Sequence, residues 1–286
     1  LIPFLQYAHN RDLREKIYMG YVMRGNNDNA NDNKEIIEEM SKLRLQKAQL
    51  LGYEDYASYV LEANMAKDVP TVDKFLADLF KPALKVAKKE LKELQEIADF
   101  QTLYTEPVTV ESWDWWYYAE MLRKAKYNFD ENELKPYLSL NNVRDGMFMV
   151  ANKLYGITFN QRTDIPVYFD GVETWEVKEK DGSHIGIIYL DYYPRDSKSG
   201  GAWCTSFREA GYDIEGNKIT PLVSLVLNFT PPTGNTPALL SWDETETLWH
   251  EFGHGLHALF SDGKYSRTCG NVPRDYVELP SQVMEN

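Results

Sequence analysis

The stretch His250-Glu251-Phe252-Gly253-His254 has the H-E-x-x-H spacing and lies within residues 242–260, which have helical periodicity. Residues four apart on a helix lie one turn apart on the same face, so His250 and His254 can bind one zinc ion together. Glu251 follows the first histidine, where its carboxylate can reach a metal-bound water and act as a general base.

The residues flanking this motif also indicate a buried helix. Ser241 and Glu244 have the spacing of a capping box at the helix start. Gly253 and Gly255 each destabilise a helix by roughly 1 kcal/mol relative to Ala, so we expect another segment to pack closely there. One face of the helix is apolar and wide enough to be buried: Leu248, Trp249, Phe252, Leu256, Leu259 and Phe260.

A third metal ligand is expected downstream. A catalytic zinc ion usually has three protein ligands and leaves its fourth position to water. Glu278 follows His254 at a separation that allows the first helix to end and a second one to return. We therefore predict zinc as the cofactor and His250, His254 and Glu278 as its ligands.

Three nearby residues are candidates for contact with a ligand histidine. Glu246 lies one helical turn before His250 and could accept the free N–H of an imidazole, or it could be a solvated helix charge. His257 is interpreted as a neighbour of the site or a packing residue, because a fourth protein ligand would close the metal site. Glu285 lies two turns after Glu278 and is either such a contact or a surface carboxylate.

The composition limits the class of protein. Of 286 residues, 43% are hydrophobic and 26% charged, as in ordinary globular proteins. The net charge of −13 argues against a nucleic-acid partner, and no apolar run approaches the ~20 residues of a membrane span. Two cysteines without a C-x-x-C spacing favour the reducing cytoplasm. Because the sequence begins at Leu1 rather than Met, a periplasmic or secreted location stays open.

The patterning changes near residue 157. Earlier residues have mostly helical periodicity, and residues 157–229 have β-branched and aromatic residues at strand-like spacing, followed by the H-E-x-x-H helix. We predict a mainly α protein with a small β-sheet (α+β). The expected organisation is a helical region, 1–156, followed by a region, 157–286, that holds the sheet and the zinc-binding core.

A small-residue segment, Gly200-Gly201-Ala202-Trp203, precedes one predicted strand. An edge strand that begins here could pair with an extended peptide substrate, and Gly201 and Ala202 would let the two backbones approach closely. The alternative is a tight turn before the strand.

Taken together, these motifs resemble the thimet-oligopeptidase family of zinc metallopeptidases, and especially its bacterial peptidyl-dipeptidase (dipeptidyl carboxypeptidase) branch. The segments that carry the resemblance extend over essentially the whole chain: residues 11–15, 31–33, 50–53, 189–191, 193–195, 200–203, 237–240, 250–260 and 273–282. The resemblance implies a two-lobed helical ellipsoid with zinc on the floor of a deep channel. It assigns the ligands to His250, His254 and Glu278 and the general base to Glu251.

The resemblance also implies an activity. Short, unstructured peptides would be the substrates, and the peptidyl-dipeptidase branch would release dipeptides from a free C-terminus. The alternative within the family is an endo-acting oligopeptidase.

The sequence departs from the family pattern in two ways. It is one residue shorter around residues 269–272. The family also continues beyond the position of Asn286 and there supplies a His and a Tyr that hold the developing oxyanion. We therefore expect an internal fragment, either a truncated chain or one piece of a nicked enzyme whose remainder is a second polypeptide. The isolated chain would then be inactive or would only bind peptides, since losing one oxyanion donor costs about 10²–10³ in rate.

Overall fold

The computed structural model describes residues 1–103, 106–128, 133–234 and 236–286. The chain forms two compact units, Leu1–Asp130 and Glu131–Asn286. This division differs from the expected boundary between residues 156 and 157. The helix α7 (Leu140–Tyr155) belongs to the second unit, because its apolar face is buried in the same core as the sheet.

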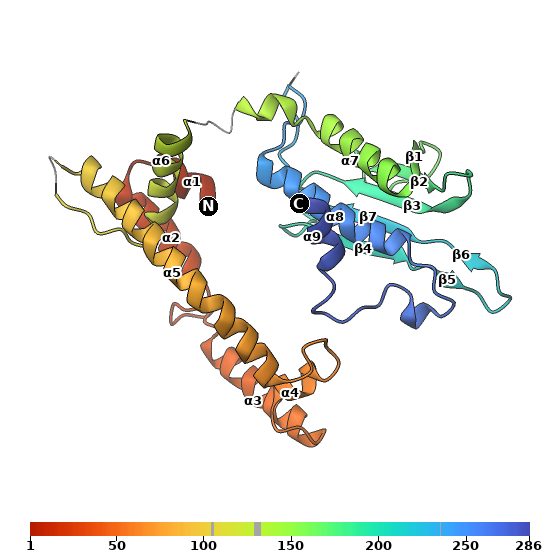
Figure 1. Cartoon of the computed structure of the whole chain (residues 1–286), viewed down its shortest axis with the longest axis horizontal. Coiled ribbons are helices and arrows are strands. Elements are labelled where there is room, and N and C mark those ends of the chain that lie inside the picture. The colour runs from red at the N-terminus through yellow and green to blue at the C-terminus, as the bar shows by residue number, and fades with distance from the viewer. Residues whose placement is uncertain (104–105, 129–132, 235) are drawn as a thin grey trace. The chain divides into compact units, whose positions relative to one another are not determined.

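The first unit is helical (Figure 1). Its helices are α1 (Ile2–Tyr7), α2 (Arg11–Val22), α3 (Lys34–Leu50), α4 (Tyr56–Leu61), α5 (Val69–Gln101) and α6 (Trp115–Tyr127). Asp114 precedes α6 and is fully buried, where it accepts hydrogen bonds from Arg14 at 2.7 Å and Arg11 at 2.8 Å. These two contacts compensate the cost of burying the carboxylate. No helix in the described ranges is both long and apolar enough to cross a bilayer.

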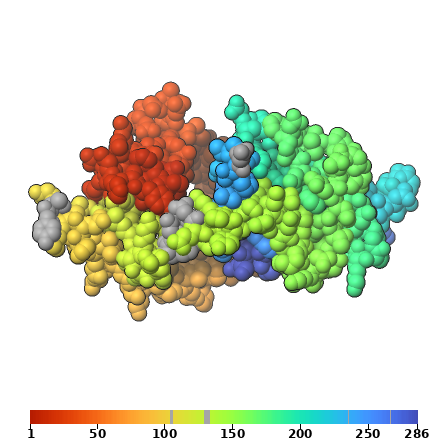
Figure 2. All heavy atoms as spheres, turned by 90° about the horizontal axis from the view of Figure 1, so that it is seen from above, coloured from red at the N-terminus to blue at the C-terminus, as the bar shows by residue number. Residues whose placement is uncertain are grey.

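The second unit is built on a five-stranded sheet with the order β1-β2-β3-β7-β4. The strands are β1 (Thr158–Gln161), β2 (Glu173–Lys178), β3 (His184–Asp191), β4 (Trp203–Arg208) and β7 (Leu222–Val226). β3 and β7 are parallel, whereas the other neighbouring pairs are antiparallel. β4 is an edge strand that pairs with β7 in a register that places Trp203 opposite Val226. A separate hairpin, β5 (Gly211–Tyr212) and β6 (Lys218–Ile219), projects from this unit (Figures 1 and 2).

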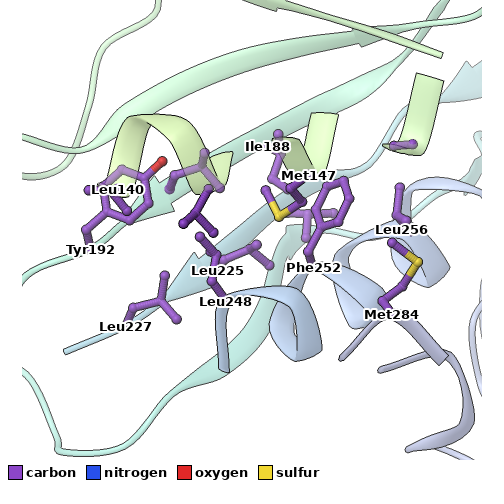
Figure 3. Packing of buried hydrophobic residues seen from close by; sticks show 14 of the residues in the cluster. Leu140, Met147, Ile188, Tyr192, Leu225, Leu227, Leu248, Phe252, Leu256 and Met284 are labelled. Carbon is purple, nitrogen blue, oxygen red and sulfur yellow. The ribbon is translucent and has the colours of Figure 1, made fainter. Parts of the chain in front are cut away.

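The second unit also contains the helical elements η2 (Lys135–Tyr137), α8 (Trp242–Leu259), the short η3 (Ser266–Thr268) and α9 (Leu279–Glu285). Helices α7 and α8 share one core with the sheet face that carries Ile188 and Leu225 (Figure 3). Met147 from α7 and Phe252 from α8 are both fully buried in it. The prediction of a mainly α protein with a small sheet is confirmed, and this core fixes α8 against the edge of the sheet that contains β4.

Candidate metal centre

The helix α8 begins with the predicted capping box. The Ser241 hydroxyl accepts a hydrogen bond from the Glu244 amide at 3.1 Å, and the Glu244 carboxylate accepts one from the Ser241 amide at 2.9 Å. The helix extends to Leu259, and Phe260 is its C-cap. The sequence therefore predicted both ends of this helix to within one residue.

The two glycines of α8 permit close packing on both sides, as expected. A Cβ atom at Gly253 would collide with the Pro280 carbonyl oxygen and would lie 2.6 Å from Ser281 Cα. A Cβ atom at Gly255 would lie 3.1 Å from a methyl carbon of Leu225 in the sheet. Gly253 therefore lets α9 cross directly over α8, which brings the residue at the start of α9 to the histidines.

That residue is Glu278, the N-cap of α9. Its Oε2 atom lies 3.2 Å from Nε2 of His250 and 3.0 Å from Nε2 of His254. The three candidate ligand atoms all lie within 4.8 Å of one another. The structure thus brings together the three residues that the sequence singled out as ligands. Across the described ranges, this is the group of His, Cys, Asp and Glu side chains close enough to share one metal ion.

Ser281 also supports Glu278, although it was not among the residues predicted from the sequence. It is fully buried, and its hydroxyl donates to Glu278 Oε2 at 2.9 Å and to the Glu278 carbonyl at 2.8 Å. The spacing alone was a weak signal, because serine hydroxyls commonly bond to groups of the residue three positions earlier. The hydroxyl restricts the orientation of the carboxylate.

Electrostatics at two of the candidate ligands, His254 and Glu278, favour the protonation states that bind a cation. Burial lowers the pKa of His254, which favours the neutral imidazole. Burial alone would raise the pKa of Glu278, but the Ser281 hydrogen bond and the neighbouring histidines outweigh it, so the pKa is lowered. A neutral imidazole and an ionised carboxylate are the forms that coordinate metals.

Glu251 lies beside these residues and is buried, with 6% of its surface exposed. Burial raises its pKa, as does the charge of Glu278, against the lowering effects of His250 and a hydrogen bond from the Cys204 backbone. Within the described residues its Oε2 atom has no hydrogen-bond partner. A buried carboxylate oxygen left unpaired is costly, so a donor on a water or substrate fits this position.

Of the three residues expected to contact a ligand histidine, Glu285 contacts His250, whereas Glu246 and His257 line clefts beside the site. Glu285 Oε2 lies 2.5 Å from His250 Nδ1. Glu278 contacts the other ring nitrogen of His250, so Glu246 is not the partner of this imidazole. Glu246 lies instead on an adjacent cleft that Glu285 also lines. His257 lines the cleft that contains His250, Glu251 and His254.

The cleft that contains the candidate ligands, called the main cleft below, has a volume of about 590 Å³ and lies between β4 and α8. It is lined by His250, Glu251, His254 and Glu278 and also by residues 202–206 of the β4 region. Ala202 therefore reaches the cleft. Gly201 does not line it and has a φ of +88°, so it forms the turn immediately before the edge strand. The segment thus forms a turn before an edge strand, and substrate binding by Gly201 and Ala202 stays a prediction.

Comparison with known proteins gives a consistent result. The chain is 40% identical to dipeptidyl carboxypeptidase from Salmonella typhimurium and to that from Escherichia coli, over 99% of its own length. It is 37% identical to oligopeptidase A from Salmonella typhimurium over its whole length. The chain spans about two fifths of these relatives, 41% of the first two and 42% of the third. The model of peptidase family M3 matches residues 4–286, and the chain therefore belongs to this metallopeptidase family.

Proposed function

We propose that these residues form the zinc-binding and proton-transferring part of a peptidase that releases dipeptides from the C-terminus of short, unstructured peptides. The observation that carries the proposal is the convergence of His250, His254 and Glu278 next to the buried Glu251. The name dipeptidyl carboxypeptidase, given to two relatives 40% identical to this chain, supports the choice of product.

The donor set fits zinc. Two imidazole nitrogens and one carboxylate oxygen make up the three protein ligands common in catalytic zinc sites. The contact between Glu285 and the second nitrogen of His250 matches the carboxylate partner that metal-bound histidines usually have. When bound, zinc supplies Lewis-acid chemistry and lowers the pKa of a coordinated water to about 7.

Glu251 is proposed as the general base. It takes a proton from the attacking water and later gives it to the amine of the departing product. Glu251 lines the main cleft beside His250, and its Oε2 atom has no hydrogen-bond partner among the described residues, which supports a role as proton acceptor next to the proposed metal ligands. Its raised pKa makes the carboxylate a better proton acceptor.

The edge strand β4 is the proposed substrate-binding element. Residues 202–206 line the same cleft as the histidines, and β7 occupies one edge of β4. An extended peptide can add to the other edge through main-chain hydrogen bonds, with Ala202 allowing close approach. Such bonds do not depend on substrate side chains, which favours broad specificity and requires an unfolded substrate.

Full activity is proposed to need sequence outside these 286 residues. The chain spans 41% of the dipeptidyl carboxypeptidases it matches. The family resemblance implies that a His and a Tyr for the oxyanion come from the remaining part, in the same polypeptide or in a second one. The 286 residues alone would then bind zinc and peptide with little or no turnover.

An endo-acting oligopeptidase is the second candidate, supported by 37% identity to oligopeptidase A. The two candidates are separated by incubating the complete zinc-loaded protein with one peptide in two forms, with a free and with an amidated C-terminus. Release of dipeptides from the free form alone supports the first candidate. Internal cleavage of both forms supports the second, and cleavage of neither contradicts the proposed peptidase.

A further inference from the structure

The segment between β3 and β4 is anchored at its middle by a buried lysine. The side chain of Lys198 is 2% exposed. Its ammonium donates to the Asp191 carboxylate at 2.9 Å, to the Asp191 carbonyl at 3.0 Å and to the Tyr193 carbonyl at 2.8 Å. Arg195 makes two further hydrogen bonds to the Asp191 carboxylate, at 2.9 and 3.0 Å. All three N–H groups of Lys198 are thus satisfied, and the segment is fixed to the end of β3.

A second anchor holds the end of the same segment. The side-chain amide of Asn228, two residues after β7, donates to the Ser199 carbonyl at 2.9 Å and to the Gly201 carbonyl at 2.6 Å. The backbone next to Asn228 is itself fixed, since the Leu227 amide donates to the Asp191 carbonyl at 2.8 Å. The Asn228 amide therefore connects the backbone just after β7 to the residues on either side of Gly200, namely Ser199 and Gly201.

The position of this anchor relates it to the cleft. Gly201 is the last residue that Asn228 holds, and the next one, Ala202, already lines the cleft with His250 and Glu251. Gly200 and Gly201 restrict the backbone little by themselves, because glycine loses more conformational freedom on ordering than any other residue. Pairing with β7 fixes the backbone of β4 from Trp203 onward. The backbone before Trp203, at Gly201, is held by the Asn228 side chain instead.

We propose that Asn228 is a positioning residue for the substrate: its amide holds the Gly200-Gly201 turn so that Ala202 and the free edge of β4 are ordered before a peptide binds. Lys198 fixes the other end of the turn. This inference rests on the proposed function, because it assumes that the peptide adds to β4. Asn228 lines neither of the two clefts that contain His250, so its effect on the reaction is through the strand.

The test compares Asn228→Ala and Asn228→Asp in the complete, zinc-loaded protein. Asp has nearly the same shape as Asn but cannot donate a hydrogen bond when ionised. The two variants therefore distinguish the effect of losing the N–H donors from the effect of losing side-chain volume. Asn217→Ala is the matched control, since Asn217 also uses its side-chain amide, on Asp213 in the β5–β6 turn. KM and kcat for an unblocked peptide, zinc content and amide hydrogen exchange are measured for each variant.

Both Asn228 variants should show faster exchange in residues 199–203 and a KM raised about tenfold, which corresponds to about 1.4 kcal/mol of ordering free energy. Zinc content should equal that of the wild type, and kcat should change less than about twofold. Asn217→Ala should match the wild type in every measurement. Unchanged KM and unchanged exchange in both Asn228 variants would overturn the inference. So would a loss of zinc and a fall in kcat without a rise in KM, which a general structural role would cause.

A failure of the proposed function gives a different result. If the wild type cleaves no peptide, binding is measured with a fluorescein-labelled octapeptide instead of KM. A tenfold weaker Kd for the Asn228 variants with faster exchange at 199–203 supports the positioning role in a peptide-binding protein. Equal Kd values in the wild type and the variants reject it.

Discussion

Oε2 of Glu278 lies 3.0 Å from Nε2 of His254, although the first residue caps α9 and the second lies in the middle of α8. The contact exists because Gly253 has no side chain, which lets the α9 backbone pass over α8. The arrangement of the proposed metal ligands is therefore determined by helix packing as much as by the ligands themselves.

Replacing Gly253 by Ala should disrupt this packing. The new methyl group would meet the backbone of Pro280 and Ser281, and overpacking of this kind costs about 1–3 kcal/mol. We expect a lower free energy of unfolding together with weaker zinc binding, measured by urea denaturation and by competition with a chelator. Gly146→Ala is the control, because a Cβ atom at this position in α7 meets nothing within 4 Å. It should stabilise the protein by about 0.4–1 kcal/mol.

Glu285 should tune the zinc affinity, whereas Glu246 should not. Glu285 accepts from Nδ1 of His250, and removing such a carboxylate partner lowers metal affinity about 10–100-fold. We expect this loss for Glu285→Gln in a competition titration with a fluorescent zinc chelator. Glu246→Gln changes an exposed carboxylate in α8, the helix that contains His250, and this variant should bind zinc as the wild type does. Equal losses in the two variants would contradict the assigned partner.

The Asp191 cluster should make stability depend on pH. Burial alone would raise the pKa of Asp191, but hydrogen bonds from Arg195, Lys198 and Tyr168 outweigh it and lower the pKa. Because the pKa in the folded protein is below its unfolded value of about 3.9, this stabilisation is present above that pH and is lost as the pH falls through the folded pKa.

Asp191→Asn should therefore lower the free energy of unfolding by about 3–5 kcal/mol at pH 7, since it leaves the Lys198 ammonium buried beside a neutral group. The difference from the wild type should shrink as the pH is lowered below about 4. Urea denaturation across this pH range measures it. Asp196→Asn, at an exposed position in the same segment, is the control. A difference that stays constant with pH would reject the ionic role of Asp191.

Local features of α8 could be predicted from the sequence, and features that depend on docking could not. The capping box of Ser241 and Glu244 involves residues three apart, so the spacing was sufficient. Gly253 and Gly255 indicated close neighbours because their helix propensity is poor. Spacing did not decide which carboxylate contacts His250. Glu246 lies one helical turn before His250, and Glu285 lies two turns after Glu278. Only the crossing of α9 over α8 places Glu285 on the ring.

The boundary between the two units shows the same limit. Composition changes at residue 157, where strand-like spacing begins, but α7 precedes this change and still belongs with the sheet. Its apolar face is typical of any amphipathic helix, and the sequence does not say which unit buries it. Lys198 and Asn228 likewise make contacts that join the segment before β4 to the end of β3 and to the residues after β7, and no local pattern reveals these contacts.

The most direct measurement is the anomalous difference map, at the zinc absorption edge, of crystals of the complete Glu251→Gln protein grown with zinc. We expect one peak about 2.0–2.2 Å from the Nε2 atoms of His250 and His254 and from a carboxylate oxygen of Glu278. The same variant should hydrolyse no peptide. A peak elsewhere, no peak with α8 and α9 both ordered, or full activity in Glu251→Gln would contradict a zinc-dependent hydrolytic site at these residues.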